Sequence, residues 1–133
     1  MTETPKLFVV PRARILVVDD NPSVREFIVR GLRSHGFEAE EAKDGRDALD
    51  LLATSSYHIL ISDVVMPHVD GVALATRARA LYPPLKIIVL SGYARERDRV
   101  QNMASVADTL LAKPFALNDL VGAVERVLQP FSC

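Results

Sequence analysis

Residues 57–71 of the chain read YHILISDVVMPHVDG. This stretch begins with a nearly continuous apolar run, His58–Ser62, which ends at Asp63, and Pro67 then interrupts regular structure. A short run of branched apolar side chains bounded by breakers is typical of a strand buried on both faces of a parallel sheet. Asp63 is therefore predicted at the carboxyl end of a central strand, where ligands bind in open α/β sheets. An aspartate that forms a turn and caps the next helix is the alternative interpretation.

Four further runs are predicted strands, and three of them also deliver polar side chains at their carboxyl ends. These three are Arg14–Val18 before Asp19 and Asp20, Leu85–Leu90 before Ser91, and Asp108–Ala112 before Lys113. The fourth run, Phe37–Lys43, is weaker and more acidic, so we expect it at an edge of the sheet.

Five segments with helical spacing alternate with these strands. They follow Asn21, Asp44, Asp70, Tyr93 and Ala116, and the fourth of them covers residues 94–104. Strict alternation of strands with helix-length crossovers predicts an α/β fold, a doubly wound five-stranded parallel sheet with helices on both faces. We expect residues 14–130 to form one domain, preceded by an N-terminal arm at 1–13 and followed by a tail at 131–133.

Composition and charge argue against several classes of partner. The chain is 49% apolar and 25% charged, with a formal net charge of −1, so no overall field favours direct binding of nucleic acid or an anionic membrane. No apolar run reaches the roughly 18 residues that a membrane span needs, and the N-terminus lacks the features of a signal peptide. We therefore expect a cytoplasmic protein. Its single cysteine, Cys133, excludes an internal disulfide.

The polar residues at the strand ends predict a single site. Parallel strands point their carboxyl ends to one edge of a sheet, so Asp19, Asp20, Asp63, Ser91 and Lys113 should converge there. Crowded carboxylates repel one another, and a hard divalent cation such as Mg²⁺ relieves that repulsion. An ammonium and a hydroxyl suit the oxygens of a phosphoryl group in transfer, and a carboxylate can act as the nucleophile and become an aspartyl phosphate.

The ordered set of motifs resembles the receiver domain of bacterial two-component response regulators. The motifs are Asp19-Asp20, Asp63 with the downstream Met66-Pro67 and Asp70-Gly71, Ser91-Gly92, and Lys113-Pro114-Phe115. The resemblance extends from about Arg14 to Leu128, and it implies the flavodoxin-like strand order 2-1-3-4-5 of the chemotaxis regulators.

The resemblance also implies roles for the acidic residues. Asp63 would be the phosphoacceptor. Asp20 and Asp63 would bind Mg²⁺ directly, Asp19 would act mainly through a metal-bound water, and the backbone carbonyl of Val65 would complete the protein ligands.

Further roles follow for the last two strand ends. Ser91 would be the switch hydroxyl and Lys113 would pair with the acyl phosphate, with Lys113-Pro114 as a cis peptide. The chain departs from the family at Leu110, where an aromatic switch residue is common, and at Val65, which cannot position a hydrolytic water.

The function implied is that of a phosphoacceptor in a two-component system or phosphorelay. Asp63 would take a phosphoryl group from a phosphohistidine of a sensor histidine kinase or a histidine phosphotransfer protein in a Mg²⁺-dependent reaction. Phosphorylation would switch the face formed by 94–104, 108–112 and 117–128, which would bind a downstream protein. Such a domain catalyses its own phosphorylation and dephosphorylation but is not expected to turn over free substrates.

Several alternatives stay open at this point. The chain could be an interaction module without phosphotransfer, against which the intact Asp20, Asp63 and Lys113 argue. It could also be a fragment of a hybrid histidine kinase, because Ser91-Gly92-Tyr93 resembles the corresponding run in receivers attached to such kinases. A flavin or nucleotide module on the same fold would need a phosphate loop after the first strand, and a Mg²⁺-dependent phosphohydrolase would usually place a second acid at position 65.

Overall fold

A computed structural model describes residues 12–64, 71–92 and 106–129 of the chain. They form a parallel sheet with the strand order β2-β1-β3-β4-β5. The strands are β1 (Arg14–Val18), β2 (Glu38–Ala42), β3 (Ile59–Asp63), β4 (Lys86–Ser91) and β5 (Thr109–Ala112). The order confirms the expected topology, with the acidic strand β2 at one edge.

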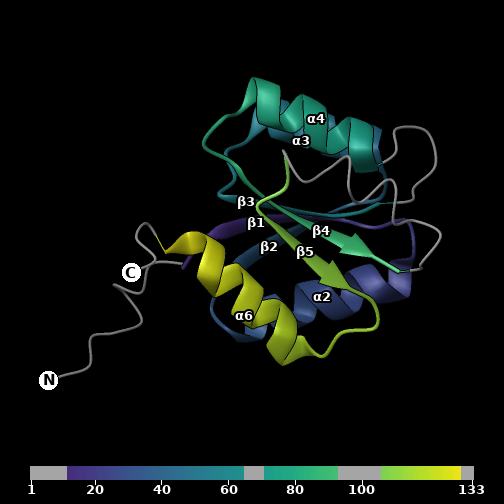
Figure 1. Cartoon of the computed structure of the whole chain (residues 1–133), viewed down its shortest axis with the longest axis vertical. Coiled ribbons are helices and arrows are strands. Elements are labelled where there is room, and N and C mark those ends of the chain that lie inside the picture. The colour runs from purple at the N-terminus through teal and green to yellow at the C-terminus, as the bar shows by residue number, and fades with distance from the viewer. Residues whose placement is uncertain (1–11, 65–70, 93–105, 130–133) are drawn as a thin grey trace, which may run out of the picture.

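Helices cover both faces of the sheet (Figure 1). In the described parts of the chain they are α2 (Pro22–Ser34), α3 (Gly45–Thr54), α4 (Gly71–Leu81) and α6 (Leu117–Leu128). The remaining predicted helix, 94–104, lies outside the described residues. None of the described helices is both long enough and apolar enough to cross a membrane.

Alternation along the buried strands divides the core into two layers. In β1, Ile15 and Val17 pack with apolar side chains of α2 and α6, whereas Leu16 and Val18 pack with those of α3 and α4. Successive side chains of a strand point to opposite faces, so a fully apolar strand serves both layers. Every residue of β3 is buried, which confirms the prediction of a central strand.

Asn21 fixes the start of α2 next to the end of β1. Its Oδ1 accepts hydrogen bonds from the backbone amides of Ser23, at 2.9 Å, and Val24, at 3.3 Å, and Pro22 occupies the first helical position. An N-cap of this type satisfies amides that would otherwise lack partners, and proline is well suited to the first turn. The turn between β1 and α2 is therefore short and well defined.

The strand boundaries differ from the predicted ones by one or two residues. Asp63 and Ser91 are the last residues of β3 and β4 rather than the residues after them. Asp108 was expected in the last strand, but it precedes β5 because its carboxylate accepts hydrogen bonds from the backbone amide of Ile87, at 2.8 Å, and from Arg79, at 2.6 Å.

Candidate functional site

The sheet register brings the predicted site residues to one edge. Asp63 pairs with Leu90 in β4, so Ser91 lies one position further along, and Ser91 pairs with Ala112, the residue before Lys113. The backbone amide of Lys113 donates to the carbonyl of Ser91 at 2.7 Å. On the other side of β3, Val18 pairs with Ser62, so the Asp19-Asp20 pair follows β1 at the same edge. The predicted convergence of the strand ends is thus present in the fold.

Three carboxylates gather at this edge. Asp19, Asp20 and Asp63 each offer an oxygen, and these oxygens all lie within 4.8 Å of one another. Asp19 is completely buried and Asp63 is 8% exposed, whereas Asp20 is open to solvent. The cluster therefore has a buried base and one solvent-facing side, through which an ion or a substrate could enter.

Lys113 connects two of the acids. Its Nζ lies 3.3 Å from Oδ2 of Asp19 and 3.3 Å from Oδ2 of Asp63. The aliphatic part of the lysine passes Gly92, where a Cβ atom would be 3.9 Å from Cδ of Lys113. The side chain of Lys113 thus reaches across the end of β4 to the end of β3 with little obstruction.

Electrostatics in the site reflect burial and crowding. Burial raises the pKa of Asp63, and repulsion from Asp19 adds to this effect, although the charge of Lys113 acts in the opposite direction. Partial burial alone would lower the pKa of Lys113, but the attraction of Asp19 and Asp63 outweighs it, so that this pKa is raised. Lys113 therefore stays an ammonium, and the charged form of Asp63 is destabilised by its surroundings.

Asp19 is held at both its carboxylate and its carbonyl. The backbone amide of Asn21 donates to Oδ1 of Asp19 at 2.9 Å, and Nη1 of Arg25 donates to the Asp19 carbonyl at 2.7 Å. Sequence reasoning did not find Arg25, because its helical position resembles that of other exposed charged residues. The signal that could have found it is the position of an arginine in the first turns of the helix that follows Asp19 and Asp20, from which its side chain can reach back to the strand end.

The remaining site predictions have different outcomes. The peptide bond between Lys113 and Pro114 is cis, as the resemblance implied. Leu110, which replaces the common aromatic residue, is 42% exposed on β5. Val65, whose carbonyl was expected to be a metal ligand, lies outside the described residues. A hydrogen bond joins the two described residues that flank positions 65–70, since the backbone amide of Gly71 donates to the carbonyl of Val64 at 2.9 Å.

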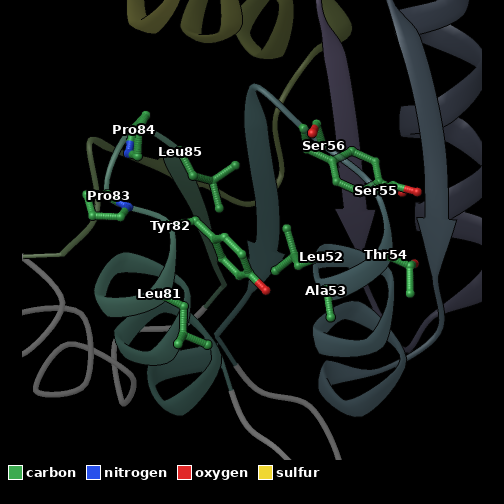
Figure 2. Close-up of a pocket in the computed structure, with 11 residues that line it drawn as sticks. Leu52, Ala53, Thr54, Ser55, Ser56, Leu81, Tyr82, Pro83, Pro84 and Leu85 are labelled. Atoms are coloured by element: carbon green, nitrogen blue, oxygen red, sulfur yellow. The ribbon is translucent and has the colours of Figure 1, made fainter.

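A separate hollow of about 530 Å³ lies between the C-terminal ends of α3 and α4, near the starts of β3 and β4 (Figure 2). Figure 2 shows the ring of Tyr82 extending toward Leu52 across this hollow. The described residues that line it include no carboxylate, amine or imidazole. This hollow therefore lacks the charged groups that gather at the carboxyl edge.

Comparison with known proteins places this geometry in a family. Residues 15–125 match the response regulator receiver domain. The response regulator MprA of Mycolicibacterium vanbaalenii is 40% identical over 116 residues, which make up 87% of this chain and 50% of that protein. The chain thus spans about half the length of the curated relatives that it matches.

Solved structures agree with this result. The chemotaxis protein CheY4 of Vibrio cholerae superimposes with a TM-score of 0.80 at 32% identity, covering 86% of this chain and 98% of that one. The response regulator TrrA of Thermotoga maritima, solved in complex with Mg²⁺ and BeF, gives a TM-score of 0.78 at 32% identity over 86% of this chain and 97% of that one. The chain belongs to the response regulator receiver domains of two-component signalling systems.

Proposed function

We propose that Asp63 is the phosphoacceptor of this receiver domain and that it takes a phosphoryl group from the phosphohistidine of a sensor kinase or a phosphotransfer protein. The observation that carries the proposal is the position of Lys113, whose Nζ is 3.3 Å from Asp63 and 3.3 Å from Asp19 within a group of three carboxylates. A fixed cation beside a nucleophilic carboxylate is suited to the negative oxygens of an incoming phosphoryl group.

Asp63 is a better acceptor than either neighbouring acid. Asp19 is fully buried, and its Oδ1 and Oδ2 already accept hydrogen bonds from Asn21 and Lys113. Asp20 is exposed and is not among the acids that Lys113 contacts. Asp63 combines slight exposure with the contact to Lys113, so its second oxygen can reach a phosphorus atom from the solvent side while the ammonium balances the charge.

The donor set also fits Mg²⁺. Three carboxylates contribute three negative charges and Lys113 one positive charge, which leaves a formal charge of −2 in the cluster. Hard oxygen ligands of this kind suit Mg²⁺, which commonly binds through one or two carboxylates and keeps several waters. Asp19, Asp20 and Asp63 would hold the ion, together with the carbonyl of Val65. When bound, Mg²⁺ supplies the positive charge that reduces repulsion between these acids and a phosphoryl group.

In the reaction, an oxygen of Asp63 forms a bond to phosphorus while the bond from phosphorus to the donor imidazole nitrogen breaks. The electron pair of that bond returns to the imidazole, which is protonated as it leaves. Lys113 contacts the phosphoryl oxygens throughout the transfer. Water later attacks the aspartyl phosphate, which releases inorganic phosphate and restores the Asp63 carboxylate.

The signal would pass along β4 and β5. Ser91 ends β4 one position beyond the partner of Asp63, and its carbonyl accepts from Lys113, so a hydroxyl contact to the phosphoryl group would act directly on the start of the next segment. We infer that the face made by 94–104, β5 and α6 responds and binds a downstream protein. This is a shift between two conformations, of which one makes better contacts with the phosphoryl group and binds that protein more tightly.

Intact mass spectrometry tests the assignment. The protein is incubated with Mg²⁺ and acetyl phosphate, and the expected result is an adduct of one phosphoryl group that is absent in Asp63→Asn and in EDTA. Asp50→Asn serves as the control, because Asp50 is exposed on α3 and is not one of the three clustered acids. If no adduct forms with acetyl phosphate or a phosphorylated histidine donor, the domain acts as an interaction module without phosphotransfer.

A further inference from the structure

Arg25, the fourth residue of α2, turns its side chain back toward the ends of two strands. Its Nη1 donates to the main-chain carbonyl of Asp19 at 2.7 Å, and its Nε donates to Oε1 of Glu41 in β2 at 2.8 Å. The side chain of Arg25 is only 16% exposed. The guanidinium is therefore fixed beside the acidic cluster. It is bonded to the main-chain carbonyl of one clustered acid, Asp19, and to the carboxylate of Glu41, which is outside the cluster.

The carbonyl that Arg25 contacts belongs to the peptide plane between Asp19 and Asp20. Because that plane is rigid, fixing the carbonyl also fixes the direction in which the chain leaves toward Asp20. The carboxylate of Asp19 is fixed separately by the amide of Asn21 at 2.9 Å. Arg25 thus contributes to the orientation of Asp20 without touching its side chain.

The same guanidinium is a potential competitor for a metal ion. A guanidinium has a planar fork of donors that matches a carboxylate, and the acidic cluster beside it carries a formal charge of −2. Glu41 provides another carboxylate for this fork. Glu41 pairs with Val17 in the sheet register and is not one of the three clustered acids. Its ion pair with Arg25 therefore directs the positive charge away from the place where a cation would bind.

We propose that Arg25 is a positioning residue of the Mg²⁺ site and that Glu41 keeps its guanidinium from occupying the acidic cluster. The inference rests on the proposed function, since it takes Mg²⁺ as the ion that the three acids hold. It predicts a defined coupling between two residues that are not ligands.

The test is the affinity for Mg²⁺, measured by calorimetric titration without a phosphodonor, together with the melting temperature in EDTA. Glu41→Gln removes the negative charge that holds the guanidinium beside β2, so we expect Mg²⁺ to bind about tenfold more weakly, the lower end of effects seen for residues that support metal ligands. The melting temperature in EDTA should stay at the wild-type value or rise, because the released guanidinium gains the acids as partners. In Arg25→Gln, a further Glu41→Gln substitution should leave the affinity unchanged.

Glu26→Gln is the matched control. It removes the same charge and breaks an arginine pair on the same helix, where Glu26 lies 3.4 Å from Arg30 in an exposed position. Equal Mg²⁺ affinities for Glu41→Gln and Glu26→Gln would overturn the proposal. A parallel loss of Mg²⁺ affinity and of stability in EDTA would overturn the competing role of the guanidinium. If the wild-type protein does not bind Mg²⁺ at all, the proposed function fails as well, and this result is distinct from the other two.

Discussion

Gly71 begins α4 directly against the backbone of Asp63. A Cβ atom at Gly71 would overlap the carbonyl oxygen of Asp63 and would lie 2.7 Å from Cα of Val64. The Gly71 amide also donates to the carbonyl of Val64 at 2.9 Å. The obstructing atoms are backbone atoms of the strand that carries the proposed phosphoacceptor, so they cannot move aside as a flexible side chain would. The absence of a side chain at position 71 allows α4 to start this close to the site.

Gly71→Ala should therefore lower the free energy of unfolding by about 3 kcal/mol, since overpacking a tight site commonly costs about 1–3 kcal/mol and sometimes more. It should also slow phosphorylation by acetyl phosphate, because the end of β3 must shift. Urea denaturation and the rate of adduct formation measure the two effects. Gly122→Ala in α6 is the control, as among the described residues its Cβ would meet only Nη1 of Arg126, at 3.5 Å, and alanine favours a helix. Equal stability of the two variants would contradict the role given to Gly71.

The sequence predicted the location of the acids and the lysine because each follows a buried apolar run. Once Asp63 was placed after a strand buried on both faces, the parallel arrangement required Asp19 and Lys113 to lie at the same edge. The packing need at Gly71 could not be foreseen, since an Asp-Gly pair equally well indicates an ordinary turn. That requirement depends on how closely α4 approaches β3.

The arginines show a second limit of sequence reasoning. Arg77 and Arg79 lie two positions apart in α4, yet Arg77 is exposed whereas Arg79 contacts four other residues. Nothing in their chemistry distinguishes them. Their difference comes from the helical phase, because Arg79 follows the buried Ala75 by four residues, and from loop carbonyls that only the tertiary fold brings near. Arg25 was missed for the same reason.

Removal of the Asp63 charge should stabilise the protein when Mg²⁺ is absent. The pKa of Asp63 is raised, chiefly by burial and then by Asp19. Above that raised pKa the charged carboxylate therefore destabilises the folded state. The penalty disappears as the pH falls below the ordinary range of a carboxyl group. At pH 7 in EDTA, Asp63→Asn should therefore melt a few degrees higher than the wild type.

Mg²⁺ should reverse that order of stability. An ion that binds only the folded protein at a hundredfold excess over its Kd adds about 2.7 kcal/mol to the wild type. Asp63→Asn should lose most of this gain, whereas Asp50→Asn should keep it. Thermal melts with EDTA and with Mg²⁺ measure the effect. A wild-type response to Mg²⁺ in Asp63→Asn would show that Asp63 is not a ligand.

A separate part of the pH dependence of stability should come from Tyr57, Glu40 and Arg14, which lie outside the acidic cluster. The hydroxyl of Tyr57 donates to Oε1 of Glu40 at 2.5 Å, and Nη2 of Arg14 donates to Oε2 at 2.6 Å. The hydrogen bond from Tyr57, followed by that from Arg14, lowers the pKa of Glu40. Burial, followed by the hydrogen bond to Glu40, raises the pKa of Tyr57 to about 12.

These directions fix the sign of each effect. Glu40 stabilises the fold above the usual glutamate pKa of 4.5 and loses that contribution as the pH falls through its lowered pKa. Tyr57 stabilises the fold below pH 10 and loses its contribution as the pH rises toward 12. The side chain of Glu40 is 40% exposed, so solvent screening makes the acid effect the smaller one. Urea titrations across pH should show a flatter alkaline limb in Tyr57→Phe and a flatter acid limb in Glu40→Gln. Unchanged slopes in these variants would mean that other groups control the profile.

Arg79 should be a main stabilising residue of the region where the chain enters β5. Its guanidinium donates to the carbonyls of Pro83 and Leu85, each at 2.8 Å, to the carbonyl of Val106 at 3.0 Å, and to Asp108 at 2.6 Å. Asp108 in turn accepts from the amide of Ile87 at 2.8 Å, which links the start of β4 to the start of β5. Lysine cannot reproduce this planar arrangement of donors.

We expect Arg79→Gln to lower the free energy of unfolding by about 3 kcal/mol, since hydrogen bonds to charged groups contribute about 1.5–3 kcal/mol and several carbonyls lose their donor together. Arg79→Lys should recover only part of this loss, and Arg77→Gln on the same helix should change stability by less than about 0.5 kcal/mol because Arg77 is exposed. Urea denaturation measures all three.

Amide hydrogen exchange should also accelerate at Thr109–Ala112 in Arg79→Gln before it changes in β1, because the lost contacts anchor the segment that leads into β5. Uniform acceleration over the whole sheet would instead show that Arg79 contributes only to global stability and does not anchor this strand in particular.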